Sequence, residues 1–132
     1  MKFKKGLITF YKSGRPKAGT LAEKTIINGT AYKKYRKIIF YKTGKVSQGY
    51  LAENKKFNDI VFKANMKVRL YLSGNIKKGT LSKDTIINGI KYKGNTEIDF
   101  FDNQLVSKGY QVNKGIILFN NRGKIVLKEM YD

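Results

Sequence analysis

The sequence predicts an all-β protein built from tandem 30-residue β-hairpin repeats, stacked as an elongated antiparallel sheet or a β-solenoid. Three observations predict this fold class: residues recur at steps of thirty, apolar and polar residues alternate with a period of two, and glycine-containing turns separate short apolar runs. No stretch shows a helical stripe, so helix is not expected. The stacked arrangement is favoured over a closed barrel, and units of this length are too short for conventional propeller blades, which usually have four strands each.

The thirty-residue period appears in single residues and in short sequence motifs. Residues 8–37 and 68–97 are identical at 14 of 30 positions without a gap. Such similarity indicates copies of one supersecondary unit, which buries its apolar face by stacking on its neighbours. We expect a single repeat domain over residues 1–132, with units at about 5–34, 35–64, 65–94 and 95–132. The period is kept by the glycines Gly19, Gly49, Gly79 and Gly109 and by the aromatic residues Tyr11, Tyr41, Tyr71 and Phe101.

The first hairpin of a unit is predicted around a glycine turn. In residues 38–41, successive side chains face opposite sides of the strand. The position of Ile39 holds Thr, Arg or Asp in the other units, so its side is expected to be the more solvent-exposed face. Residues 42–45 form the turn, because Gly44 adopts the positive φ that other residues resist. The return strand is expected over residues 46–52, where Gly49 permits a bulge or a close backbone approach.

A second, shorter hairpin is predicted at Asn28-Gly29 and Asn88-Gly89, since Asn-Gly between apolar runs is a strong hairpin signal. Asn58-Asp59 is a weaker but compatible turn. The fourth unit is irregular: Gln104 replaces the turn glycine, and residues 117–125 align with residues 38–46 as a foreshortened copy. We expect this end to cap the array. The aromatic residues predicted to form the core are Phe10, Phe40, Phe100, Tyr32, Phe62 and Tyr92.

Charge and composition narrow the classes of function. The chain has 28 Lys+Arg against 9 Asp+Glu, a net charge of +19 that lies in residues 1–94, because residues 95–132 are neutral. Without Cys or His there are no disulfides, thiolate or imidazole metal ligands, or imidazole acid–base groups, so we expect no cofactor and no enzyme. Glu97 and Asp99 lie on one strand face at a spacing that permits a carboxylate dyad or a divalent-ion site. We interpret them as an exposed strand that balances basic neighbours.

The sequence is compatible with two cellular locations. The basic residues at the N-terminus are not followed by an apolar run of signal-peptide length, and no transmembrane segment is expected. Both a cytoplasmic protein and a surface protein trimmed of its leader fit the sequence. The abundance of Lys, Asn and Ile over Arg and His favours a bacterial origin.

The word Phe-Tyr-x-x-Gly-Lys-Val at residues 40–46, followed by Gly49, resembles the bacterial MORN-type repeats. Residues 87–92 resemble the second Gly-x-x-Tyr element of that family, and the resemblance covers about residues 8–109. The same words are more weakly similar to the hairpin repeats of choline-binding and clostridial-toxin surface domains. The MORN resemblance implies a β-hairpin array that serves as a scaffold, a partner-binding surface or a lipid-surface contact.

We predict a non-enzymatic binding or scaffold module that presents a basic, Tyr-bearing face to a protein or an anionic surface such as phospholipid or another polyanion. With 24 Lys and 4 Arg, nucleic-acid binding would be nonspecific and salt-dependent. Two alternatives remain: a cell-surface carbohydrate-binding domain whose tyrosines stack on sugars, and a purely structural, self-assembling spacer. The oligomeric state is left open. The predicted ligand-binding residues are Lys17, Lys33, Lys63, Lys77, Lys93, Tyr11, Tyr41 and Tyr71.

Overall fold

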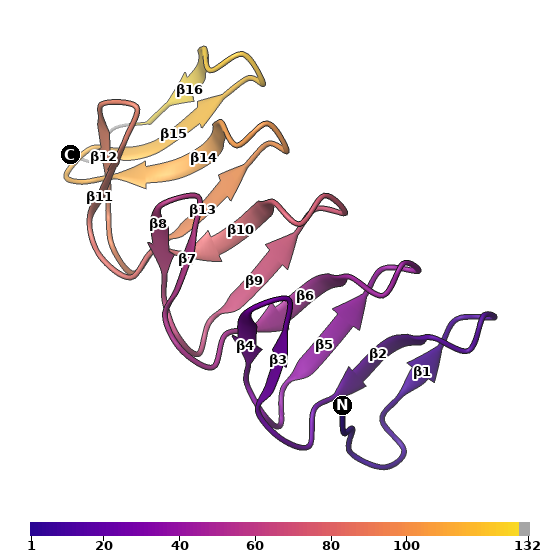
Figure 1. The fold of residues 1–132 in the computed structure, drawn as a ribbon. Coiled ribbons are helices and arrows are strands. Elements are labelled where there is room, and N and C mark those ends of the chain that lie inside the picture. The colour runs from indigo at the N-terminus through magenta and orange to yellow at the C-terminus, as the bar shows by residue number, and fades with distance from the viewer. Residues whose placement is uncertain (130–132) are drawn as a thin grey trace.

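The computed structural model describes residues 1–129, which form sixteen β-strands (Figure 1). The predicted all-β class is confirmed, and the strands form a large, open antiparallel sheet rather than a closed barrel. No helix able to span a membrane occurs within residues 1–129. Residues 130–132, which end the predicted fourth unit, lie outside the described residues.

Ten strands follow one another across what we call the main sheet, each pairing antiparallel with the next. Equivalent strands begin thirty residues apart, as β5, β9 and β13 do, because the same turn and strand residues recur at that step. The main-sheet strands are β1 (Thr9–Phe10), β2 (Pro16–Thr20), β5 (Lys37–Phe40), β6 (Val46–Tyr50), β9 (Lys67–Leu70), β10 (Ile76–Thr80), β13 (Glu97–Phe100), β14 (Val106–Gln111), β15 (Gly115–Phe119) and β16 (Ile125–Lys128).

Three short hairpins stand along one side of the main sheet, and we call them the covering hairpins (Figure 1). Their predicted turns are confirmed: Asn28 and Gly29 have φ of 51° and 78°, and Asn58 and Asp59 have 50° and 64°. Each hairpin touches the main sheet through its last residue, as in the bridge between Tyr32 and Leu51. They are β3 (Thr25–Ile27) with β4 (Thr30–Tyr32), β7 (Lys55–Phe57) with β8 (Ile60–Phe62), and β11 (Thr85–Ile87) with β12 (Ile90–Tyr92).

Each recurring strand glycine lies under an aromatic ring of a preceding segment. A Cβ added to Gly49 would lie 2.6 Å from Cδ1 of Tyr32, and one added to Gly79 would lie 2.5 Å from Cδ1 of Phe62. The close approach expected at Gly49 is therefore made by the ring of Tyr32 and not by a backbone. The predicted bulge lies earlier in the strand, at Ser47, where the register shifts. The same ring-on-glycine contact joins Phe3 to Gly19 and Tyr92 to Gly109.

The predicted core is confirmed at Tyr32, Phe62 and Tyr92, which are at most 2% exposed. Burial raises the pKa of both Tyr32 and Tyr92 to about 12. The core cluster continues along the inner side of the main sheet through Ile38, Val68 and Ile98.

The core prediction is wrong for Phe10. Phe40 and Phe100 are buried as expected, but Phe10 is 56% exposed. Phe40 packs edge to face on Phe3 and Phe100 on Phe62, each ring coming from the segment that precedes it. Phe10 belongs to β1, the edge strand at this end of the main sheet, which pairs with β2.

The foreshortened hairpin at residues 117–125 is present as β15 and β16. Asn120 N donates to Lys124 O at 2.8 Å, just as Tyr41 N donates to Lys45 O at 2.7 Å. No covering hairpin separates β14 from β15, because the chain turns directly at residues 112–114.

Candidate functional site

The side chains that alternate with the core residues point away from the covering hairpins, and we call this side the outer face. On β5, Ile38 and Phe40 are buried while Ile39, between them, is only half-buried. Cross-strand pairing then fixes which outer-face residues become neighbours. The most polar run of such neighbours, which we call the central row, is Gln48, Arg69, Lys78, Asp99 and Lys108.

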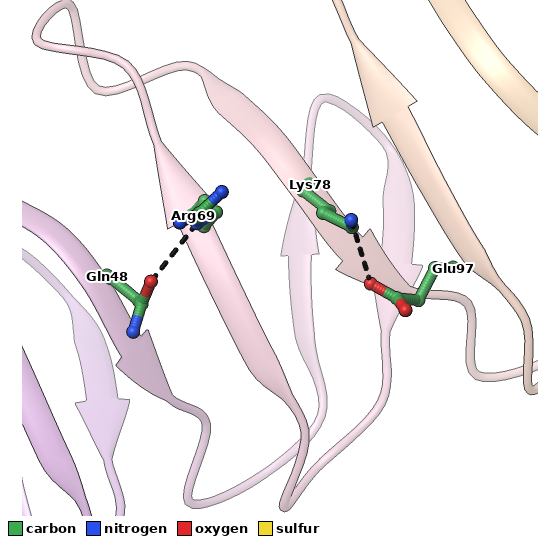
Figure 2. Close-up of polar contacts among 4 residues, drawn as sticks. All are labelled: Gln48, Arg69, Lys78 and Glu97. Atoms are coloured by element: carbon green, nitrogen blue, oxygen red, sulfur yellow. Dashed lines mark hydrogen bonds and ion pairs between the residues drawn. The ribbon is translucent and has the colours of Figure 1, made fainter.

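Two polar contacts orient the central row (Figure 2). Arg69 Nε donates to Gln48 Oε1 at 3.1 Å, and Lys78 Nζ lies 3.4 Å from Glu97 Oε2. Both contacts are exposed and contribute little stability. Their effect is to hold the cationic groups in place over the sheet.

The outer face is strongly basic. Two of its carboxylates, Glu97 and Asp99, are both on β13. The rings of Tyr50 and Tyr110 lie among its cations, with the guanidinium of Arg36 4.0 Å from the centroid of Tyr50. The basic residues of this face include Lys17, Arg36, Lys37, Lys67, Arg69, Lys77, Lys78 and Lys108.

Asp99 is the half-buried carboxylate of the central row, between Lys78 and Lys108. Burial raises its pKa above the ordinary value of a carboxyl, although the two lysines act in the opposite direction. None of residues 1–129 donates a hydrogen bond to it. Asp99 therefore remains an unused acceptor on a cationic surface.

The predicted tyrosines lie half-buried at the ends of their strands, and their hydroxyls join neighbouring hairpins. Tyr11 donates to Phe40 O, Tyr41 to Leu70 O and Tyr71 to Phe100 O, each at 2.7 Å. The acceptor is 29 residues ahead in every case, so one contact is repeated along the sheet. These hydroxyls serve packing between hairpins, and a ligand role for the rings stays a prediction.

Replacing Tyr41 by phenylalanine is expected to lower the free energy of unfolding by about 1 kcal/mol, because Leu70 O loses its donor. Denaturant titration measures the change. The control is Tyr35→Phe, since Tyr35 is 56% exposed, and its expected effect is near zero. Equal effects of the two variants would contradict a stabilising role of the Tyr41 hydroxyl.

The structure divides the predicted lysines into two groups. Lys17 Nζ lies 5.8 Å from the ring centroid of Tyr11, and Lys77 Nζ lies 5.4 Å from that of Tyr71, so these pairs are brought together. The other group follows the covering hairpins: the backbone N–H groups of Lys33, Lys63 and Lys93 donate to Tyr50 O, Thr80 O and Tyr110 O, each at 2.8 Å. Lys33, Lys63 and Lys93 share one register, but they lie at the opposite end of the strands from Tyr11, Tyr41 and Tyr71.

Sequence reasoning missed Arg69, Lys78 and Lys108. Lys78 and Lys108 are thirty residues apart, but the first two units hold Ala18 and Gln48 at that position, and no other unit has a basic residue at the position of Arg69. Alternation along the strands could have assigned them to the more solvent-exposed face. Their adjacency depends on the cross-strand register, which includes the bulge residue Lys77.

A shallow pocket of about 170 Å³ lies on the outer face between neighbouring hairpins. Its walls include Arg69, Tyr71, Lys78, Asp99, Phe101 and Ser107. A larger hollow of about 350 Å³ lies on the other side, beside the covering hairpins, and its floor is the apolar core around Tyr32 and Phe57. Charged and aromatic groups therefore converge in the outer-face pocket.

No group of three or more metal-ligating side chains is found in the part of the chain that the structure describes. Comparison of the chain with models of known families, with curated proteins and with solved structures found no match.

Proposed function

We propose that the chain is a non-enzymatic binding module whose outer face captures an extended anionic partner by electrostatic attraction. The observation that carries this proposal is the central row of the outer face, where Arg69 and Lys78 lie on neighbouring strands and Lys108 lies beyond the intervening strand of Asp99. Tyrosine rings between the cations add apolar contact area. The field of a protein with a net charge of +19 adds long-range attraction.

We further propose that the chain is a tandem array of 30-residue hairpin units of the MORN type, forming one repeat domain that acts as a scaffold. What supports this is the spacing of equivalent strands and the repeated contact of a tyrosine hydroxyl with a carbonyl 29 residues ahead. In such an array the outer face extends with each unit. A long polymer would then meet several hairpins at once.

The test compares two variants, each of which loses three positive charges from a different part of the molecule. The outer-face variant carries Arg69→Gln, Lys78→Gln and Lys108→Gln. Its binding to inorganic polyphosphate at low salt is expected to fall about 100-fold, taking roughly 1 kcal/mol per basic side chain at an anionic surface. The salt dependence of binding is expected to become less steep, because fewer counterions are released.

The matched control carries Lys56→Gln, Lys83→Gln and Lys91→Gln, exposed lysines on or beside the covering hairpins. Both variants have the same net charge. The control is expected to lose less than about tenfold in affinity, because it changes only the long-range field. Equal losses in the two variants would mean that net charge alone governs binding, and the outer face would not be the site.

A further inference from the structure

The outer-face pocket has two aromatic walls that belong to neighbouring hairpins. Tyr71 and Phe101 are thirty residues apart and both border the pocket. The ring of Tyr71 is held in place, because its hydroxyl donates to Phe100 O at 2.7 Å. Flat aromatic side chains at the edge of a shallow pocket fit a ligand with an apolar ring face.

Arg69 in the pocket is oriented by an uncharged side chain, whereas Lys78 is paired with the exposed carboxylate of Glu97. Gln48 Oε1 accepts from Nε of Arg69, which leaves the terminal nitrogens of the guanidinium as donors. Lys78 and Lys77 border the same pocket. Together these groups fit a carboxylate or another oxyanion, for which a guanidinium can supply paired donors.

Asp99 is the feature that a site for a simple oxyanion would not contain. An ionised carboxylate only accepts hydrogen bonds, and it repels phosphate or sulfate at short range. Asp99 is half-buried in the pocket wall and receives no hydrogen bond from residues 1–129. A ligand hydroxyl would satisfy it, and the hydroxyl of Ser107 borders the same space.

We propose that the anionic partner is an acidic polysaccharide and that this pocket holds one of its sugar units. The proposal rests on the proposed function, which requires only an anionic partner, and adds the ligand class. The acidic group of the sugar lies at Arg69 and Lys78, its hydroxyls donate to Asp99, and its apolar ring face packs on Tyr71 or Phe101. Phosphate chains and nucleic acids fit this pocket less well, because they bring more negative charge and fewer hydroxyl donors to the carboxylate.

The test compares Asp99→Asn with Glu97→Gln in the full chain, using oligogalacturonate and inorganic polyphosphate as probes. Glu97 is the matched control, since it is exposed on the same strand and each variant removes one negative charge. Glu97→Gln is expected to strengthen binding of both probes two- to threefold. Asp99→Asn is expected to strengthen binding of polyphosphate similarly but to weaken binding of oligogalacturonate about tenfold, because charge-assisted hydrogen bonds are lost.

Phe101→Leu gives a second readout, with a loss of affinity expected for oligogalacturonate alone. Thermal unfolding checks that each variant folds. If Asp99→Asn strengthens binding of both probes, or if the unaltered chain binds polyphosphate or anionic phospholipid vesicles but not oligogalacturonate, the ligand class is wrong. The proposed function fails separately, when the Arg69, Lys78 and Lys108 variant binds polyphosphate as well as its control does.

Discussion

Replacing Phe40 by alanine is expected to lower the free energy of unfolding by about 3–5 kcal/mol, whereas Phe10→Ala is expected to lower it by less than about 1 kcal/mol. The two residues occupy the same position of the thirty-residue period. Phe40 is 4% exposed and packs on Phe3, while Phe10 is 56% exposed. Truncating Phe40 leaves a cavity in the core, and truncating Phe10 removes a side chain that is mostly in water.

Urea titration of both variants, monitored by circular dichroism, measures the difference. The pair is its own control, because residue type, substitution and repeat position are identical. Similar losses at Phe10 and Phe40 would contradict the exposed placement of Phe10. They would indicate that another segment covers the first strand in solution.

Replacing Gly79 by alanine is expected to lower the free energy of unfolding by about 3 kcal/mol, the upper part of the range for overpacked cores. The new Cβ would lie 2.5 Å from Cδ1 and 3.0 Å from Cε1 of Phe62, which is 0% exposed. A ring held on all sides cannot withdraw without moving its neighbours. The strand or the covering hairpin must therefore shift.

A double-mutant cycle tests this cause. Phe62→Leu removes part of the ring, so the double variant is expected to be more stable by at least 1 kcal/mol than the two single losses predict together. Gly14→Ala is the control: Gly14 has a φ of 89° and no atom within 4 Å of an added Cβ. Its cost arises from backbone strain, and it should add to that of Phe62→Leu without coupling. Additive losses at Gly79 and Phe62 would show that their contact does not limit stability.

The predicted hairpins could be located from the sequence because their signals are local. Asn28-Gly29 and Gly44 adopt the positive φ that their turns require, and the alternation of apolar residues places Ile38 and Phe40 on the buried side. The weaker turn at Asn58-Asp59 adopts the same conformation. Each of these signals acts over only a few residues, and none depends on another unit.

The binding face was only partly accessible to sequence reasoning. Equal spacing indicated Lys33, Lys63 and Lys93, which share one register but lie at the opposite end of the strands from Tyr11, Tyr41 and Tyr71. Residues that match along the sequence are one unit apart, whereas residues that meet on a sheet are cross-strand partners. Arg69 and Lys78 are such partners although they occupy different positions of the period.

The class of fold, the positions of the turns and the charge of the molecule follow from the sequence alone. Turn geometry and alternation are properties of neighbouring residues, and net charge is a property of composition. Three features could be seen only in the folded chain: Gly49 lies under the ring of Tyr32, Phe10 is exposed, and Asp99 lies between two lysines. The physical reason is that these features depend on strand register, on the bulge that shifts it, and on which segment precedes each hairpin.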